Sequence, residues 1–445
     1  MAAEPADPLW RVLQNVLNHL VSNPYPHLPN PTGCKKRASV AVIIRVRPEY
    51  APILDTKESV VNVQPPQDGA APSSLDEFFS QAWVQNGDPE VLFIKRTGRP
   101  GDRWSGHVAL PGGKRDPEDE SDVAAAIRET REEVGLDLST AHCLKAGNLP
   151  ERVVATTWGR TPLMVLCPYI FVLTGKETPK IYPQPTEVAA CHWVPLRALL
   201  SPNLRTREYV DTASRMAKQG GPVAQWLLRM LVGRMVFSAV QLLPSETVYA
   251  SSIEDFIPPN QESRAAELLL GALPLPAEAA RHRLAFQKPL LLWGLTLGIL
   301  ADLLDVLPPY NAVRLWRYPT FTPIDLRALM WLFTRNLRKN NAGELSAGTW
   351  PAYANRTAMD ASTQALAVTE AEPLRLAQPG MKYSNEVGIG GLGVGSTPKD
   401  AVGRLLAGYY ERVNYAIIFF VMYRMALGST VGYWLFKLWR RRSGQ

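Results

Sequence analysis

Residues 111–136 limit what this chain can fold into more than any other segment. They read PGGKRDPEDESDVAAAIRETREEVGL, a glycine turn followed by a helix-forming run. Glu129, Glu132 and Glu133 are spaced i, i+3 and i+4, so a helix places their carboxylates on one face. Arg128 can pair with one of them, but a single guanidinium does not neutralise three acids. The segment therefore predicts a helix whose acidic face holds a cation.

A β-sheet is predicted beneath this helix. Val123, Ile127 and Val134 fall on the opposite side, where they can pack on strands, and Gly135 suits the C-terminal end of the helix. Strand-like runs surround the helix, at 38–47, 90–96, 107–111, 152–158, 162–173 and 188–196. Strands in this order around one helix indicate an α+β domain with a mixed sheet.

The acidic face suits a hard divalent cation. Mg²⁺ and Mn²⁺ prefer carboxylate oxygens and keep several waters. Such an ion would bridge to a phosphate oxygen and supply a water as nucleophile, which is the chemistry of pyrophosphate hydrolysis. The alternative is an acidic surface that only faces solvent. The Gly112-Gly113 turn before the helix and the glycine that closes it favour the metal site.

The same segment resembles the sequence box of the Nudix hydrolases, G-x5-E-x7-R-E-U-x-E-E-x-G-U, where U is apolar. Residues 128–136, RETREEVGL, match the box, with Thr130 at its first apolar position. One spacing is a residue too long, so either Asp119 or Glu120 takes the position of the first acid. The resemblance implies the Nudix fold, a mixed β-sheet sandwiched between helices, here with insertions and a helical C-terminal extension.

The resemblance also implies roles for individual residues. Glu129, Glu133, Glu132 and the carbonyl of Gly113 would hold Mg²⁺ or Mn²⁺, Glu132 would serve as a further ligand or as the base that activates water, and Arg128 would orient Glu132. Glu187 is a further candidate acid, and Arg96, Arg99, Arg103, Lys114 and Arg115 are candidates for holding substrate phosphates. His107 is interpreted as a structural turn or strand residue.

One branch of the family, the coenzyme A diphosphatases, carries the same extra residue. Its box opens in a way that is similar to GGKRDP at 112–117, its upstream signature is partly similar to 92–113, and its closing helix is similar to WGLT at 293–296. The resemblance implies hydrolysis of coenzyme A or acyl-CoA to 3′,5′-ADP and 4′-phosphopantetheine. Two alternatives are an ADP-ribose or dinucleotide diphosphatase and a non-catalytic, membrane-tethered Nudix module that binds a ligand.

Charge and cysteine content narrow the class of protein. The net charge is +7, and residues 401–445 carry +6 of it, so the rest of the chain lacks the basic excess that a nucleic-acid partner needs. The four cysteines have no paired spacing, and the first residues form no apolar leader. An intracellular protein without nucleic acid is therefore expected.

The composition divides the chain into five parts. These are a helix and proline-rich lead-in at 1–37, a Nudix domain at 38–309 with insertions near 55–88 and 200–285, a basic amphipathic helix at 310–345, a flexible linker at 346–398 and a C-terminal helix at 399–445. The apolar run at 223–243 is predicted as a buried or amphipathic helix, and 289–307 as the last helix of the domain.

The C-terminal helix contains an apolar run, 413–436, that is long enough to cross a membrane. Arg424 lies in its middle, at a cost of about 2.5–3.5 kcal/mol on insertion scales, which the apolar neighbours offset. A helix on the membrane surface or packed on the domain is the alternative. The basic residues after 436 favour a mitochondrial or peroxisomal membrane, and Gly428 and Gly432 would let two helices approach in a homodimer.

Overall fold

The structure is a computed structural model that describes residues 8–48, 71–98, 106–155, 162–211, 231–250, 289–310, 312–346 and 401–443. The chain divides into two compact units. The first unit comprises 1–152, 163–206 and 239–315, and the second comprises 153–162, 207–238 and 316–445.

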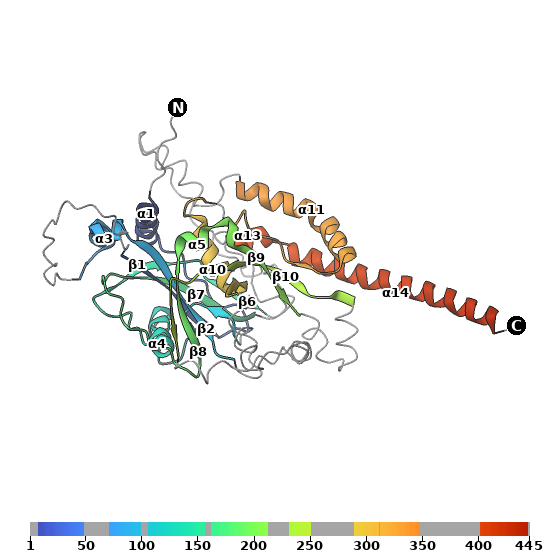
Figure 1. Cartoon of the computed structure of the whole chain (residues 1–445), viewed down its shortest axis with the longest axis horizontal. Coiled ribbons are helices and arrows are strands. Elements are labelled where there is room, and N and C mark those ends of the chain that lie inside the picture. The colour runs from blue at the N-terminus through green and yellow to red at the C-terminus, as the bar shows by residue number, and fades with distance from the viewer. Residues whose placement is uncertain are drawn as a thin grey trace, which may run out of the picture. The chain divides into compact units, whose positions relative to one another are not determined.

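The first unit contains both helices and strands, whereas the second unit is mostly helical (Figure 1). The first unit holds α1 (Leu9–Ser22), β1 (Arg37–Arg47), α2 (Leu75–Ser80), α3 (Ala82–Gln85), β2 (Asp88–Arg96), β3 (Val108–Ala109), β4 (Gly112–Lys114), α4 (Asp122–Val134), β5 (Cys143–Asn148), β7 (Pro162–Leu173), β8 (Val188–Pro195), α5 (Leu196–Leu200), η2 (Pro202–Leu204), β11 (Glu246–Tyr249), β12 (Leu291–Trp293) and α10 (Gly294–Asp305). The second holds β13 (Thr320–Phe321), α11 (Ile324–Ser346), α13 (Ala401–Leu406) and α14 (Tyr409–Arg442). Strands β6 (Arg152–Ala155), β9 (Arg205–Val210) and β10 (Met235–Gln241) have residues in both, and the first residue of β7, Pro162, belongs to the second unit.

The main sheet of the first unit is mixed, as predicted. Its strands follow the order β11-β8-β2-β1-β7-β5. Strand β1 runs parallel to β7, with Val40 opposite Pro168, and antiparallel to β2, with Ile44 opposite Val91. The strands predicted at 38–47, 90–96, 162–173 and 188–196 are confirmed. Strand β11, which lies in the predicted insertion 200–285, pairs with β8 in this sheet.

Helix α4 packs on this sheet through its apolar side. Val134 and Ala126 belong to the buried core, and Val123 and Ile127 pack against it. Thr130 is buried although its position in the box is apolar, because its hydroxyl donates a hydrogen bond to the Ala126 carbonyl at 2.7 Å. The helix therefore turns its acidic face away from the core.

Both ends of α4 have the residues that helix termini require. Ser121 at the N-terminus accepts a hydrogen bond from the Ala124 amide at 3.1 Å. Gly135 at the C-terminus is left-handed, with φ at 73°, which a glycine adopts without strain. These caps fix where the helix begins and ends, and so the phase at which its glutamates face β4.

Helix α10 closes the first unit, so the helix predicted at 289–307 is confirmed over Gly294–Asp305, whereas Leu291–Trp293 form a strand. Its residues are almost all buried, and Asp302 forms a buried ion pair with Arg152. Strand β12 precedes it and pairs with the last residues of β10, Trp293 opposite Ala239.

The helix predicted at 223–243 is wrong over its second half, where Met235–Gln241 form strand β10. Six of the seven residues of this strand are buried, so they read as a continuous apolar run rather than as an alternating one. Periodicity does not separate such a strand from a buried helix. Residues 223–230 lie outside the described residues.

The second unit is organised by α11 and α14. The predicted helix at 323–339 is confirmed as part of α11. Asn341 on α11 donates hydrogen bonds to the carbonyls of Leu405 at 3.1 Å and Ala407 at 2.9 Å, and the rings of Phe333 and Phe419 lie 6.0 Å apart. Among the described residues, α14 is the one helix with the length and composition to cross a membrane. Most of the predicted linker at 346–398 lies outside the described residues.

Candidate active site

Strand β4 forms the floor beneath the acidic face of α4. Gly112 pairs with Val40 and Gly113 with Ser39 of β1, so the glycine turn is fixed at the centre of the sheet. Gly112 has φ at 143°, and a Cβ there would lie 2.2 Å from the Ser39 carbonyl oxygen. Only glycine lets the chain pass this close to β1.

Glu133 is the deepest acid of the site. Its side chain is 2% exposed, and one carboxylate oxygen accepts a hydrogen bond from the Gly112 amide at 2.8 Å. The Arg96 guanidinium lies 3.9 Å from the other oxygen. Burial raises the pKa of Glu133 to about 8, with smaller raising effects from Glu129 and Glu187 and with the Gly112 hydrogen bond and Arg96 acting in the opposite direction. A buried carboxylate whose pKa is raised by burial is suited to a positive ligand.

Glu129 lies directly over Gly113. A Cβ at Gly113 would lie between 2.3 and 2.6 Å from the Glu129 carboxylate, so the glycine leaves the space that this carboxylate occupies. Burial raises the pKa of Glu129, and Glu132 and Asp116 also raise it. The predicted ligands Glu129, Glu133 and Gly113 are therefore brought together on β4 and α4.

Arg128 ties the acidic face to the loop before the helix. It donates hydrogen bonds to both carboxylate oxygens of Asp119 at 3.0 Å, to Glu132 at 3.0 Å and to Glu129 at 3.1 Å. The Arg128 hydrogen bonds lower the pKa of Asp119, and Asp119 in turn raises the pKa of Arg128. Asp119 is buried and Glu120 is exposed, so Asp119 takes the position of the first acid in the box. The extra residue lies between Asp119 and Arg128.

The other predicted site residues differ in how their side chains are used. Glu187 is exposed, and its charge acts on Glu133. Lys114 is exposed and lies 3.9 Å from Asp116. Arg115 is bound to the loop and helix start, with hydrogen bonds to the carbonyls of Asp119 and Glu120 and to Asp122. Arg99 and Arg103 lie outside the described residues.

A second acidic group lies elsewhere in the first unit. His27, Asp122 and Glu151 each offer a ligand atom within 4.8 Å of the others, which among the described residues the helix glutamates do not. The Arg37 guanidinium fills this group, with Nε 2.8 Å from Asp122 and Nη2 2.7 Å from Glu151. We interpret it as a buried ion-pair network, because Arg37 and Arg115 already pair with its two carboxylates.

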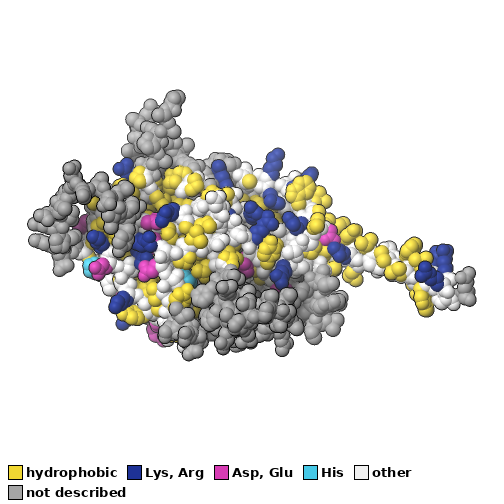
Figure 2. Space-filling view, in the orientation of Figure 1, with side chains coloured by type: hydrophobic (Ala, Val, Ile, Leu, Met, Phe, Trp, Pro, Cys, Tyr) yellow, Lys and Arg dark blue, Asp and Glu magenta, His cyan; other side chains and the backbone are white. Residues whose placement is uncertain are grey.

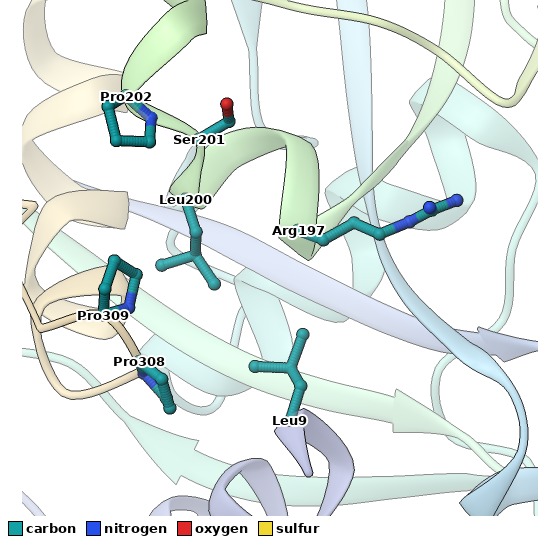
Figure 3. A pocket seen from close by; sticks show the side chains of 7 residues that line it. All are labelled: Leu9, Arg197, Leu200, Ser201, Pro202, Pro308 and Pro309. Atoms are coloured by element: carbon teal, nitrogen blue, oxygen red, sulfur yellow. The ribbon is translucent and has the colours of Figure 1, made fainter. Parts of the chain in front are cut away.

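A surface pocket of about 330 Å³ has a mostly apolar lining and shares no residue with the acidic site. It is lined by Leu9, Arg197, Leu200, Ser201, Pro202, Pro308 and Pro309 (Figure 3). In Figure 3 the Arg197 side chain extends away from the other labelled residues, and its guanidinium pairs with Asp88 at 2.7 Å. The pocket offers no carboxylate to a metal.

Sequence reasoning missed two features of the site. The Gly112 amide that holds Glu133 is a backbone group and leaves no signal in the residue pattern. Asp116 lies 3.5 Å from Arg128 and raises the pKa of Glu129. Its position in the acidic loop before α4 is a sequence signal that could have indicated this role.

A model of the NUDIX domain family matches residues 81–213, which include β4 and α4. An uncharacterised protein of Schizosaccharomyces pombe is 32% identical over 328 residues, which cover 72% of this chain and 81% of the relative. The chain contains a Nudix domain. The uncharacterised Nudix hydrolase NudL of Yersinia pestis is 32% identical over 114 residues, 26% of this chain and 52% of NudL. This Nudix chain thus spans about half the length of that relative.

Solved structures also include Nudix proteins with some likeness to this Nudix hydrolase. A Nudix hydrolase of M. smegmatis, RenU, is 19% identical, covers 37% of this chain and 74% of its own, and has a TM-score of 0.23. The NUDIX domain of Shewanella oneidensis NrtR, solved with ADP ribose, is 16% identical, covers 41% of this chain and 85% of its own, and has the same TM-score.

Replacing Gly113 by alanine should lower turnover by about a hundredfold or more, because the new methyl group displaces the Glu129 carboxylate and small misplacements of catalytic groups cost this much. Steady-state rates on a hydrolysed substrate would measure it. Gly343→Ala is the matched control, since nothing lies within 4 Å of a Cβ at that position. Equal rates for the two variants would show that Glu129 does not need its place over Gly113.

Proposed function

We propose that this Nudix hydrolase cleaves the diphosphate of coenzyme A or acyl-CoA, releasing 3′,5′-ADP and 4′-phosphopantetheine. The observation that carries the proposal is Asp119. It takes the acid position of a box with one extra residue, the spacing that resembles the coenzyme A diphosphatase branch, and it binds Arg128 through both carboxylate oxygens. The longer loop is therefore a built feature of the site and not a disrupted motif.

The residues present fit a divalent cation. The donors are hard oxygens, burial raises the pKa of two of the carboxylates, and the missing side chain of Gly113 lets the Glu129 carboxylate lie against β4. Glu129, Glu133, Glu132 and the Gly113 carbonyl would hold Mg²⁺ or Mn²⁺. When bound, the ion would supply positive charge for the phosphate oxygens and a more acidic water.

The protein groups have separate tasks in this proposal. Glu132 is the most exposed of the three glutamates, at 59%, and can reach a proton on the attacking water. Arg128 holds Glu132 and Asp119 at once, so it is a positioning residue for the base. Arg96, which lies 3.9 Å from Glu133, and the exposed Lys114 on β4 would bind substrate phosphates.

A substrate panel tests the assignment. Coenzyme A, ADP-ribose and a dinucleotide would be incubated side by side with wild type and Mg²⁺ or Mn²⁺, and products separated by chromatography. We expect coenzyme A to give the highest kcat/KM, with 3′,5′-ADP as product. Faster cleavage of ADP-ribose or the dinucleotide would replace the proposed substrate, and binding without any metal-dependent turnover would identify a non-catalytic module.

We also propose that this hydrolase works at a membrane, to which α14 attaches it. The length and composition of α14 support this, and the arginines at its end favour a mitochondrial or peroxisomal membrane. Subcellular fractionation followed by carbonate extraction is the direct test of both points.

A further inference from the structure

Helix α14 changes character along its length. Its first part packs within the second unit and buries Tyr409, Tyr410, Val413, Ala416, Ile417 and Phe420. From Met422 to Ser443 every residue is exposed. The predicted span 413–436 therefore combines a half that is already covered by protein with a half that nothing in the described chain covers.

An ion pair marks the point where the two halves meet. Arg424 donates from Nε at 2.9 Å and from Nη2 at 2.5 Å to one carboxylate oxygen of Asp325, at the start of α11. Phe419 contacts Phe333 further along α11, so the two helices run antiparallel up to this pair. Beyond Arg424, α14 continues past the N-terminal end of α11.

The exposed half is apolar on all sides of the helix. Tyr433, Trp434, Leu435 and Phe436 are consecutive, and each is more than half exposed. Successive helical residues are about 100° apart, so these four surround the axis. No charged residue occurs from 425 to 436, whereas the packed half exposes Glu411 and Arg412. Figure 2 shows hydrophobic side chains along this part of the chain and basic ones at its end.

Building on the membrane attachment proposed above, we propose that α14 enters a lipid bilayer after Arg424, with Met425 to Phe436 in the hydrocarbon and the Arg424–Asp325 pair at the surface. Lys437 extends toward the headgroups of the far side. From Arg424 to Arg440 the helix rises about 24 Å, somewhat less than the ~30 Å hydrocarbon core. Arginine side chains at both ends extend toward the headgroups and make up the difference. Arg424 then lies outside the hydrocarbon, unlike in a span at 413–436.

A bilayer explains the exposed surface better than a second copy of the chain. A partner helix covers one stripe, as Gly428 and Gly432 would permit, and leaves the other sides of the helix in water. A helix that is apolar all round requires an environment that is apolar all round. Tyr433, Trp434 and Trp439 followed by three arginines are also the residues that favour a membrane interface.

Two matched variants test where the bilayer begins. Val431 and Ile418 are exposed apolar residues of the same helix, at 50% and 55%. In flotation with phosphatidylcholine vesicles, Val431→Arg in the full chain should weaken binding by about a hundredfold, as insertion scales indicate for a charge at the centre of a span. Ile418→Arg should leave binding within about threefold of wild type. Equal losses would place the boundary before Ile418 and overturn the proposal.

A fluorescent label separates lipid from a second copy. Val431→Cys and Ile418→Cys, each in a Cys143→Ser background and labelled with an environment-sensitive dye, would be compared with and without the same vesicles. We expect vesicles to shield the label at 431 from iodide and expose it to quenchers on lipid chains, with no such change at 418. Shielding of 431 without vesicles would show a protein partner, and no shielding at all would show that α14 stays in water; either contradicts the proposal.

Discussion

Replacing Glu133 by glutamine is expected to lower metal-dependent turnover by at least about a thousandfold. Metal-ion stabilisation of the reacting phosphate is worth several kcal/mol, and each 1.36 kcal/mol is a factor of ten in rate. Glutamine keeps the size of the side chain and can still accept the Gly112 hydrogen bond, so the change removes charge alone. Rates at saturating substrate and Mg²⁺ would measure the loss.

Glu120→Gln is the matched control, because Glu120 is exposed and its replacement by glutamine removes the same negative charge close to the site. It should keep activity within about twofold of wild type, as surface substitutions away from a site do. A Glu133→Gln variant that retains wild-type turnover would remove Glu133 from the catalytic machinery. Similar losses in both variants would point to net charge and not to a specific ligand.

The stability of the same variant has a predictable dependence on pH. Burial raises the pKa of Glu133 to about 8 in the folded chain, above the ~4.3 of an unfolded chain. Between these values the unfolded chain releases the proton and the folded chain keeps it, so wild type loses stability relative to Glu133→Gln as pH rises. In thermal unfolding with EDTA from pH 5 to 8, the Tm of the variant should rise relative to that of wild type. A variant that is folded and at least as stable as wild type has lost activity for a reason other than misfolding.

Replacing Arg37 by methionine should destabilise the first unit by about 3–5 kcal/mol, because Glu151 would remain buried without its arginine and Asp122 would keep only Arg115. Both carboxylates are at most 6% exposed, and Arg37 also donates to the Leu28 carbonyl and Asn30. At roughly 3 °C per kcal/mol for a domain of this size, Tm should fall by roughly 10 °C. Calorimetry or circular dichroism would measure the shift.

Arg197→Met is the comparison for a pair in solvent. Arg197 is 70% exposed and pairs with Asp88, and such pairs are worth at most about 1 kcal/mol. Adding Asp122→Asn and Glu151→Gln to Arg37→Met should recover part of the stability, since the loss comes from unpaired charge. A small Tm change in Arg37→Met would mean that water reaches these carboxylates and that the network is not structural.

The site helix and the mixed sheet could be predicted from the sequence because their signals are local. Spacing within one helix fixes which glutamates share a face, and runs such as 162–173 are unambiguous strands. The register between β4 and β1 could not be predicted, because Gly113 and Ser39 lie far apart in the chain. The choice between Asp119 and Glu120 was open for the same reason: only the folded loop shows which carboxylate reaches Arg128.

Apolar content alone misled in two places. It indicated a helix where Met235–Gln241 form a strand, since a strand buried on both faces has no alternation. It also could not show that the first part of 413–436 is covered by protein, because burial against a neighbouring helix and burial in lipid select the same residues. Arg37 and its partners gave no local signal, since Asp122 and Glu151 are distant in sequence.

The pairing of β4 with β1 has a practical consequence for anyone who trims this protein. The family-matched stretch, 81–213, begins after β1 has ended, so a fragment cut to those limits would lack the strand that fixes Gly112 and Gly113. It would also lack α10, leaving Arg152 buried without Asp302. We therefore expect a fragment that keeps these contacts to begin before residue 37 and to extend past residue 305.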